Sequence, residues 1–228
     1  MTENRVIAID GPSGAGKSSV SKRVGAALGY LHVDSGALYR IMTWQCLEKG
    51  VDTSDPEAVA ACAAKVEIDC RPENGAIAFR VGGEAPGDRI RTPAINAHAS
   101  SVATVKAVRD RITALLRGLT RHGNLVVEGR DITTAVFPDS PARFYLTASA
   151  EARAMRRQKE EVEKGIANQS AEAVKASLLA RDAIDSTRRY APLRKADGAF
   201  EIDSTHLTLD QVVETVLNAL PAGWRGEA

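Results

Sequence analysis

The chain has 228 residues, of which 44% are hydrophobic and 26% are charged, so it is long enough for one large domain with a buried core. Its 30 basic and 29 acidic residues leave a formal net charge of +1, which argues against a general nucleic-acid or membrane-surface binder. The first residues show no signal-peptide pattern and no apolar run reaches about 18 residues, so we expect a cytoplasmic protein without a membrane span.

The cysteines and histidines show no metal-binding pattern. Cys46, Cys62 and Cys70 share no ligand spacing, and the four histidines are scattered singly. We therefore expect free thiols in a reducing compartment and no zinc site built from protein ligands. Arginine outnumbers lysine, which fits either bidentate binding of phosphate or a genome rich in G and C.

The first predicted unit is a strand, a glycine loop and a helix. Residues 5–10 are apolar and β-branched, as in a buried parallel strand, and residues 11–18 read GPSGAGKS, which fits G-x-x-x-x-G-K-[ST]. In such a loop, backbone N–H groups surround phosphates, Lys17 reaches the β- and γ-phosphates, and the Ser18 hydroxyl binds Mg²⁺. A helix from about Lys17 to Leu28 would direct its positive end to the same place. A chance glycine-rich turn is the alternative, and the flanking strand and helix argue against it.

The next segments continue the alternation and then change character. A strand at 31–33 and a helix at 37–49 are followed by a short helix that Asp55 and Pro56 open. Residues 66–70 and 76–81 then alternate apolar and polar side chains around Asn74-Gly75, which predicts a β-hairpin, with a third short strand considered near Glu84. We expect a small antiparallel sheet inserted at about residues 65–92.

The rest of the chain returns to strands and helices. We expect a long helical stretch from Thr92 to about Thr120, strands at 125–128, 143–147 and 199–202, and helices at 149–163, 171–190 and 208–220. Strands that alternate with helices predict a doubly wound parallel sheet, and ligands of such sheets bind beyond the carboxyl ends of the strands.

Polar residues follow three of these strands. The first strand leads into the phosphate loop, the second into residues 34–40 (DSGALYR), and the strand at 125–128 into Gly129, Arg130 and Asp131. We expect the three segments to meet in one cleft. Two alternatives stay open: Asp34 and Ser35 also suit a helix N-cap, and Arg130–Asp131 also suits a surface ion pair worth under ~1 kcal/mol. Gly129 favours the functional interpretation, because it permits close backbone approach.

Two predicted helices carry arginines on one face. They are Arg153, Arg156 and Arg157 at i, i+3 and i+4, and Arg181, Asp185 and Arg188 at i, i+4 and i+7, with a loop around Gly165 between the helices. This spacing indicates a cationic flap over phosphates, although a solvated ladder of ion pairs would have the same spacing. No guanine-reading Asn-Lys-x-Asp segment occurs, so a small phosphotransferase with two anion sites is favoured over a GTPase.

With these features in place, the chain resembles the bacterial cytidylate (CMP) kinases of the nucleoside monophosphate kinase family over nearly its whole length. Five segments carry the resemblance: residues 10–18 (DGPSGAGKS), residues 34–40, Ile90-Arg91 with the helix from Ser100 to Arg109, residues 129–131 with 136–139 (VFPD), and residues 181–188 with Ala191-Pro192-Leu193. The first segment marks only a phosphate loop, whereas the second, fourth and fifth together are specific to this family.

The resemblance implies a P-loop NTPase-type fold with a parallel five-stranded sheet and helices on both faces. It implies a core of residues 1–64, 93–150 and 190–228, a monophosphate-binding insert at about 65–92, and a short helical lid at about 151–189. The implied reaction transfers the γ-phosphoryl group of ATP to CMP, and to dCMP, with Mg²⁺ bound beside ATP. A monomer that contacts neither nucleic acid nor membrane is expected.

The resemblance also assigns the site residue by residue. The ATP site falls on Gly11, Pro12, Ser13, Gly14, Ala15, Gly16, Lys17, Ser18, Ser19 and Arg157. The CMP site falls on Asp34, Ser35, Arg40, Ser100, Arg109, Arg130, Asp131, Asp185 and Arg188. In this assignment Arg40 and Arg130 hold the acceptor phosphate, Ser100, Arg109 and Asp131 face cytosine, and Asp185 and Arg188 face the sugar. The catalytic set is Lys17, Arg130, Arg181 and Arg188.

Two positions depart from the family pattern. Glu128 stands where the family usually has Asp, which keeps the charge on a longer side chain, and Thr133 stands where it usually has Gly, which adds a Cβ near the cleft. The turn at 203–206 is a candidate for adenine contacts from its place after the last strand. A kinase for another small acceptor, such as UMP or a non-nucleotide alcohol, and a P-loop binding protein without turnover remain the alternative functions.

Overall fold

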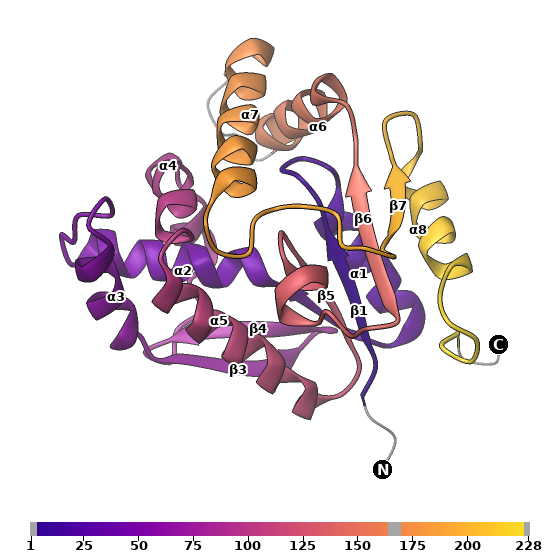
Figure 1. Cartoon of the computed structure of the whole chain (residues 1–228), viewed down its shortest axis with the longest axis horizontal. Helices are drawn as coiled ribbons and strands as arrows, with labels where there is room; N and C mark the ends of the chain where they lie inside the picture. The colour runs from indigo at the N-terminus through magenta and orange to yellow at the C-terminus, as the bar shows by residue number, and fades with distance from the viewer. Residues whose placement is uncertain (1–3, 164–169, 226–228) are drawn as a thin grey trace.

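The computed structural model describes residues 4–163 and 170–225, and its centre is a seven-stranded sheet in the order β3-β4-β2-β5-β1-β6-β7 (Figure 1). The strands are β1 (Val6–Asp10), β2 (Leu31–Asp34), β3 (Ile68–Glu73), β4 (Ala76–Val81), β5 (Leu125–Gly129), β6 (Ala142–Thr147) and β7 (Phe200–Asp203). The five strands β2, β5, β1, β6 and β7 pair in parallel, as predicted.

The hairpin β3–β4 extends this sheet instead of forming a separate one. Its strands are antiparallel, and Asn74 and Gly75 form the tight turn with φ of 49° and 75°. The pair His32 and Ala76 joins β4 in parallel to β2, so the expected insert is continuous with the core sheet. A single bridge between Val81 and Glu84 takes the place of the third strand considered near Glu84.

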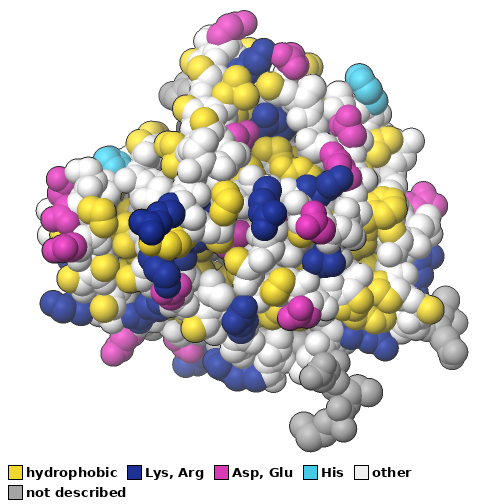
Figure 2. All heavy atoms as spheres, viewed as in Figure 1, with side chains coloured by type: hydrophobic (Ala, Val, Ile, Leu, Met, Phe, Trp, Pro, Cys, Tyr) yellow, Lys and Arg dark blue, Asp and Glu magenta, His cyan; other side chains and the backbone are white. Residues whose placement is uncertain are grey.

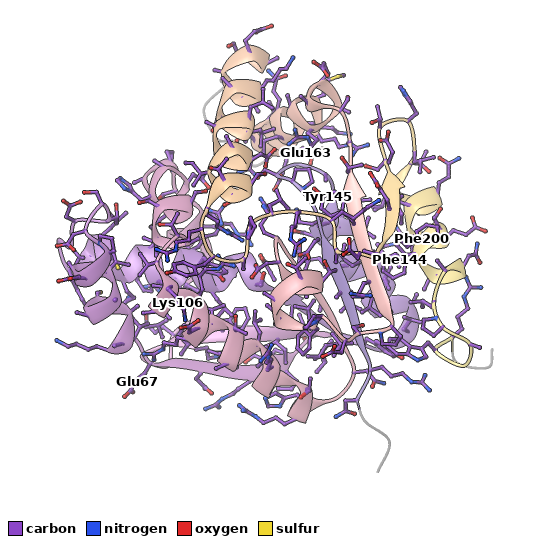
Figure 3. All side chains as sticks on the ribbon, viewed as in Figure 1. Glu67, Lys106, Phe144, Tyr145, Glu163 and Phe200 are labelled. Carbon is purple, nitrogen blue, oxygen red and sulfur yellow. The ribbon has the colours of Figure 1, made fainter. Side chains whose placement is uncertain are left out.

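Alternating residues of the central strands face two separate cores. Ile7, Ile9 and Val126 pack with α1 (Lys17–Leu28) and α8 (Leu209–Asn218). Ala8, Val127 and their neighbours face the other side, which is covered by α2 (Ser35–Glu48), α3 (Pro56–Ala64) and α5 (Lys106–Gly118). Because both faces are buried, these strands are apolar throughout rather than alternating. At the β6–β7 end of the sheet, the rings of Phe144 and Phe200 lie 6.1 Å apart (Figure 3).

The long helical stretch predicted from Thr92 is two helices, and that part of the prediction is wrong. Thr92 caps the first, α4 (Pro93–Val102), as predicted, and the chain turns at Ala103–Val105 before α5 begins. The break allows Val102 and Val105, three residues apart, both to be buried in the core. The guanidinium of Arg109 donates to the Ala103 carbonyl at 2.9 Å, which satisfies an acceptor that the end of α4 leaves free.

The helices α6 (Ala150–Glu163) and α7 (Ala171–Thr187) stand together above the carboxyl ends of the strands (Figure 1). They pack on each other through Ala154, Val174 and Leu178. The loop expected around Gly165 lies outside the described residues. Among the helices that the structure describes, none is long and apolar enough to cross a bilayer.

Candidate active site

A cavity of about 720 Å³ opens at the carboxyl ends of the strands, between the phosphate loop and the helices α6 and α7. The structure brings most of the predicted site residues to its wall: Ser13, Gly14, Ala15, Gly16, Lys17, Ser18, Ser19, Asp34, Ser35, Arg40, Ser100, Arg130, Asp131, Arg157, Arg181, Asp185 and Arg188. Gly11, Pro12 and Arg109 do not line it. Basic and acidic side chains are interspersed below the lid helices on the face drawn in Figure 2.

Glycines give the phosphate loop its shape. A Cβ on Gly11, whose φ is +151°, would lie 1.9 Å from the Leu146 carbonyl oxygen, so no other residue fits there. Gly16 precedes α1 in the left-handed conformation and offers no side-chain cap, so the first N–H groups of that helix remain available. A free helix N-terminus beside a glycine loop is suited to bind phosphate.

Lys17 is buried at the base of this loop. Its ammonium donates to the Pro12 carbonyl oxygen at 2.8 Å. Burial, reinforced by the nearby charge of Arg130, lowers the pKa of Lys17 to about 7. A phosphate placed in the loop would supply the negative charge that the ammonium lacks.

Ser13 joins the phosphate loop to three other elements. Its N–H donates to Asp182 of α7 at 3.0 Å, and its carbonyl oxygen accepts from Arg153 of α6 at 2.9 Å. Its hydroxyl accepts from Arg130, the residue after β5, at 3.0 Å. Arg153 also pairs with Asp182, so the bases of both lid helices are fastened to the loop.

Asp131 lies at the centre of a buried charge cluster with Arg109 and Arg188. Its carboxylate accepts from Arg109 at 2.5 Å and lies 3.6 Å from the guanidinium of Arg188, and each of the three residues is at most 7% exposed. The alternative of an exposed pair at Arg130–Asp131 therefore does not hold. Arg109 also stacks on the Tyr39 ring at 5.3 Å and lines a second cavity of about 410 Å³.

Three further arginines bring positive charge to the cavity wall. Arg130 pairs with Asp185 at 3.1 Å, and Arg40 donates to Asn96 at 2.7 Å. Burial, together with the charge of Arg181, lowers the pKa of Arg40 to about 10. Burial and the charge of Arg130 also lower the pKa of Arg181, and its buried Nε has no hydrogen-bond partner among the described residues. Crowded cations with free donors are typical of a site that an anionic ligand completes.

Carboxylates lie beside the phosphate loop at the ends of β2 and β5. Asp34 caps α2 by accepting from the Ala37 N–H, and it also lines the cavity. Burial raises the pKa of Glu128, but hydrogen bonds from His32 and Ser18 and the charge of Lys17 outweigh it and leave the pKa below its usual value. The Ser18 hydroxyl with one or two carboxylates is a donor set that Mg²⁺ accepts when phosphates supply further oxygens. No group of three or more His, Cys, Asp or Glu side chains that could hold a metal ion occurs in the described part of the chain.

Thr133, the second departure from the family pattern, is accommodated without a left-handed backbone. Its hydroxyl and its N–H both donate to Asp10, at 2.6 and 2.7 Å, and Ile132 N–H donates at 2.9 Å. Burial raises the pKa of Asp10 to about 6 in spite of these bonds. Asp10, at the end of β1, thus holds the segment that follows Asp131.

The cavity has an apolar wall that the sequence motifs did not identify. Leu207, which precedes α8, and Leu209 and Val212, in its first turn, line the cavity together with Ser204. Of the 203–206 turn considered for adenine, only Ser204 reaches the cavity, and its hydroxyl already accepts from Arg156 at 2.9 Å. The signal available in the sequence was the amphipathic helix predicted at 208–220, after the last strand.

Comparisons with known proteins agree with this geometry. A profile of the cytidylate kinase family matches residues 7–222. Proteins named cytidylate kinase from Streptomyces griseus and Mycolicibacterium paratuberculosis are 46% and 44% identical over 93% and 94% of this chain, and over 90% and 94% of their own lengths. One from Limosilactobacillus fermentum is 40% identical over 95% of both chains. An uncharacterized protein from Eubacterium ventriosum shares the fold, with a TM-score of 0.52 at 10% identity over 94% of this chain and 96% of its own.

Proposed function

The chain belongs to the cytidylate kinase family, and we propose from this that it transfers the γ-phosphoryl group of ATP to CMP and dCMP, giving ADP with CDP or dCDP. The observation that carries the proposal is one cavity with two halves: a phosphate loop on one side and the buried Arg109–Asp131–Arg188 cluster on the other. Such a cavity suits two nucleotides that face each other.

The phosphate-loop half is proposed to hold ATP. Backbone N–H groups of residues 11–18 and the free end of α1 would surround the phosphates, and Lys17 would turn from the Pro12 carbonyl to the β- and γ-phosphates. Ser18, with Glu128 beside it, would hold Mg²⁺, which when bound neutralises charge on the β- and γ-phosphate oxygens. Kinases that use ATP generally need this ion. The apolar wall at Leu207, Leu209 and Val212 leaves room for the adenine ring.

The other half is proposed to hold the acceptor. Arg40 and Arg130 would bind its phosphate, and Asp185 and Arg188 its sugar. Cytosine offers an amino group that a carboxylate accepts, whereas uracil offers a carbonyl oxygen that Asp131 would repel. Asp131 is suited to bind this amino group because two arginines keep its position fixed. Ser100, which lines the cavity, would add a contact to the base, and Arg109 would act on the base through Asp131.

The transfer needs no protein base. The attacking atom is an oxygen of the acceptor phosphate, whose second pKa lies near ~6, so it is largely anionic at neutral pH. The residues of the chain therefore act by positioning and by charge: Arg130 and Arg188 fix the acceptor, and Lys17 and Arg181 stabilise charge on the transferred group. The Nε of Arg181 has no hydrogen-bond partner within residues 4–163 and 170–225, which supports its assignment to a ligand.

Closure is proposed to exclude water from the transfer. The insert at about 65–92 and the lid at about 151–189 would move against a core formed by residues 1–64, 93–150 and 190–228. Because both halves of the cavity come from one chain, a monomer suffices for the reaction. Cys46, Cys62 and Cys70 are free thiols, which supports the proposal that the protein acts in the reducing cytoplasm.

A coupled ADP-release assay with a panel of acceptors tests the proposal. CMP and dCMP are expected to give kcat/KM values at least 100-fold above those of UMP and AMP, because the buried carboxylate rejects a base that cannot donate to it. Arg130→Ala should raise KM for CMP while ATP affinity stays within a few fold. Equal use of UMP would remove the role of Asp131, and absence of turnover with every acceptor would leave a P-loop binding protein instead.

A further inference from the structure

A buried histidine, His32, lies behind the phosphate loop and outside every assignment made above. It is on β2, next to β5, and its side chain is 7% exposed. The Nε2 atom lies 3.1 Å from Oε1 of Glu128, whose side chain is 5% exposed. Since an ionised carboxylate can only accept a hydrogen bond, the proton of this bond is on Nε2.

The sheet explains why these side chains meet. In the ladder between β2 and β5, His32 is opposite Val126 and Asp34 is opposite Glu128. Val33 and Val127 face the core under α2, so the residues that alternate with them, His32, Asp34, Val126 and Glu128, face α1. His32 and Glu128 are therefore diagonal neighbours on the face that carries Lys17 and Ser18.

Glu128 connects this hydrogen bond to the donor site. Glu128, in β5, and Ser18, at the start of α1, both line the main cavity. A hydroxyl beside a carboxylate can donate its proton to that carboxylate and keep its lone pairs for a cation. Because Glu128 is held by His32, the place of the carboxylate that would share a cation with Ser18 depends on His32.

We infer that His32 is a positioning residue: its Nε2–H holds the Glu128 carboxylate in the wall of the cavity that Ser18 also lines, and so prepares Glu128 and Ser18 to bind the divalent cation of the donor nucleotide. His32 touches neither nucleotide nor cation. The alternative is a histidine that merely fills a polar gap in the core. That alternative predicts a loss of stability on substitution, but no selective loss of metal-dependent binding. The inference rests on the proposed role of the phosphate loop as the ATP–Mg²⁺ site.

Binding of ADP measured by calorimetry, with Mg²⁺ and separately with EDTA, tests the inference without any acceptor. His32→Leu should weaken binding of the Mg²⁺ complex about tenfold, as loss of a group that orients a metal ligand generally does, and leave binding in EDTA within about twofold. His32→Gln, whose amide donates from a similar reach, should behave like the wild type. The matched control is His122→Leu, because His122 precedes the amino end of β5, whereas the phosphate loop lies at the carboxyl ends of the strands, and it should change neither value.

A double-variant cycle tests whether His32 acts through Glu128. In a Glu128→Gln background, His32→Leu should add less than about twofold to the loss, because the group that it positions is already altered. Equal weakening with Mg²⁺ and with EDTA, or a full additional tenfold loss in the Glu128→Gln background, would overturn the inference.

The wild-type protein supplies a second measurement that needs no folded Leu variant. A long-range ¹H–¹⁵N spectrum, assigned by comparison with His32→Gln, should show His32 with its proton on Nε2 and a shift when Mg²⁺ joins bound ADP, but none when CMP is added. A proton on Nδ1, or no response to Mg²⁺, would contradict it. A wild type that binds Mg²⁺–ADP but does not phosphorylate CMP would refute the proposed function alone.

Discussion

At the scale of single residues, the charges of the candidate site are balanced in pairs and threes instead of being exposed to water. Asp131 pairs with two arginines, and Ser13 forms hydrogen bonds with three residues from separate parts of the chain. Removing one member therefore leaves a buried charge without its partner, which costs more than the bond itself is worth. Two predictions follow from Asp131 and Asp10.

Asp131→Asn should lower kcat/KM for CMP by about 100-fold and lower the free energy of unfolding by about 3 kcal/mol. The amide keeps the shape of the carboxylate but leaves Arg109 and Arg188 without their shared negative charge. Steady-state kinetics and urea denaturation measure the two effects. Asp110→Asn, which removes an exposed partner of Lys106, is the control and should leave both nearly unchanged. Wild-type stability in Asp131→Asn would contradict the buried cluster.

Asp10→Asn should remove a pH-dependent part of the stability between pH 4 and pH 6. Burial raises the pKa of Asp10 from 3.8 to about 6, so the folded state binds the proton more tightly than the unfolded state. Its contribution is fully present below about pH 4 and is lost as pH rises through 6. The free energy of unfolding of the variant, relative to wild type, should therefore rise by about 1–3 kcal/mol from pH 4 to pH 6.5. Urea denaturation at each pH measures it, and a constant difference would exclude the shift.

Sequence motifs identified most of the cavity-lining residues but not their partners. The phosphate loop and the arginines can be recognised in the sequence from their residue types and spacing, and most of them line the cavity. The resemblance assigns Arg109 to the base, and the structure adds two partners that spacing does not show, the Ala103 carbonyl oxygen and Asp131. The partnership of His32 with Glu128 depends on strand order, which spacing does not contain.

At the scale of elements, caps and breaks decide where the helices lie. Asp34, Asp55, Thr92 and Thr208 each cap a helix. Asp55, Thr92 and Thr208 lie at or within one residue of a predicted helix start, whereas α2 begins at Ser35, two residues before its predicted start at residue 37. The break at Ala103–Val105 was not predictable from local signals, since no glycine or proline marks it and tertiary burial of two valines decides it. Elements are therefore well predicted where capping is local and poorly where packing overrides propensity.

Asp182→Ala should detach the lid helices from the phosphate loop. The variant loses the acceptor for the Ser13 N–H and leaves Arg153 buried without a carboxylate. We expect the free energy of unfolding to fall by about 3 kcal/mol and KM for ATP to rise several fold, with KM for CMP less affected. Thermal denaturation and initial rates measure this, and Glu172→Ala, exposed on the same helix, is the control. Unchanged KM for ATP would mean that the fastening plays no part in binding.

Thr208→Ala should destabilise the protein by about 1 kcal/mol without changing its kinetics. Thr208 accepts from the Gln211 N–H, and the Gln211 side chain accepts from the Thr208 N–H, so the change breaks a capping box at the start of α8. Thr208→Ser keeps the hydroxyl and should stay near wild type. Urea denaturation gives the free energies, and an equal loss in both variants would assign the effect to the methyl group.

At the scale of the whole molecule, a nearly neutral protein carries a cation-rich cavity. The formal net charge is +1, yet among the described residues nine basic and six acidic side chains line the cavity. The class of fold was predictable because its parallel strands are buried on both faces, and the apolar runs show this directly. The joining of the hairpin to the main sheet was not, because it rests on one backbone pairing, between His32 and Ala76.

Reversing one charge should distinguish the effect of charge at the cavity from the effect of the protein's net charge. Lys159 lines the cavity and Lys65 does not, yet Lys159→Glu and Lys65→Glu each lower the formal net charge by two. We expect the first variant to raise KM for ATP several fold at low salt and the second to leave it unchanged. The difference should fade between 0.1 M and 1 M KCl, where the screening length falls from about 10 Å to about 3 Å. Equal effects of the two variants would show that only the net charge acts.

The register of β1 against β5 has a consequence for how such an enzyme could be redesigned. Asp10 and Gly129 form the last rung of that ladder, so the phosphate loop and Arg130 begin side by side, about 4.8 Å apart, the spacing of neighbouring strands. The distance between the starts of these two segments is set by strand pairing, so movement of α6 and α7 should not change it. Exchanging the acceptor-reading residues 35–40 and 100–109 for others should therefore change which molecule is phosphorylated while the separation of donor and acceptor stays as the backbone set it.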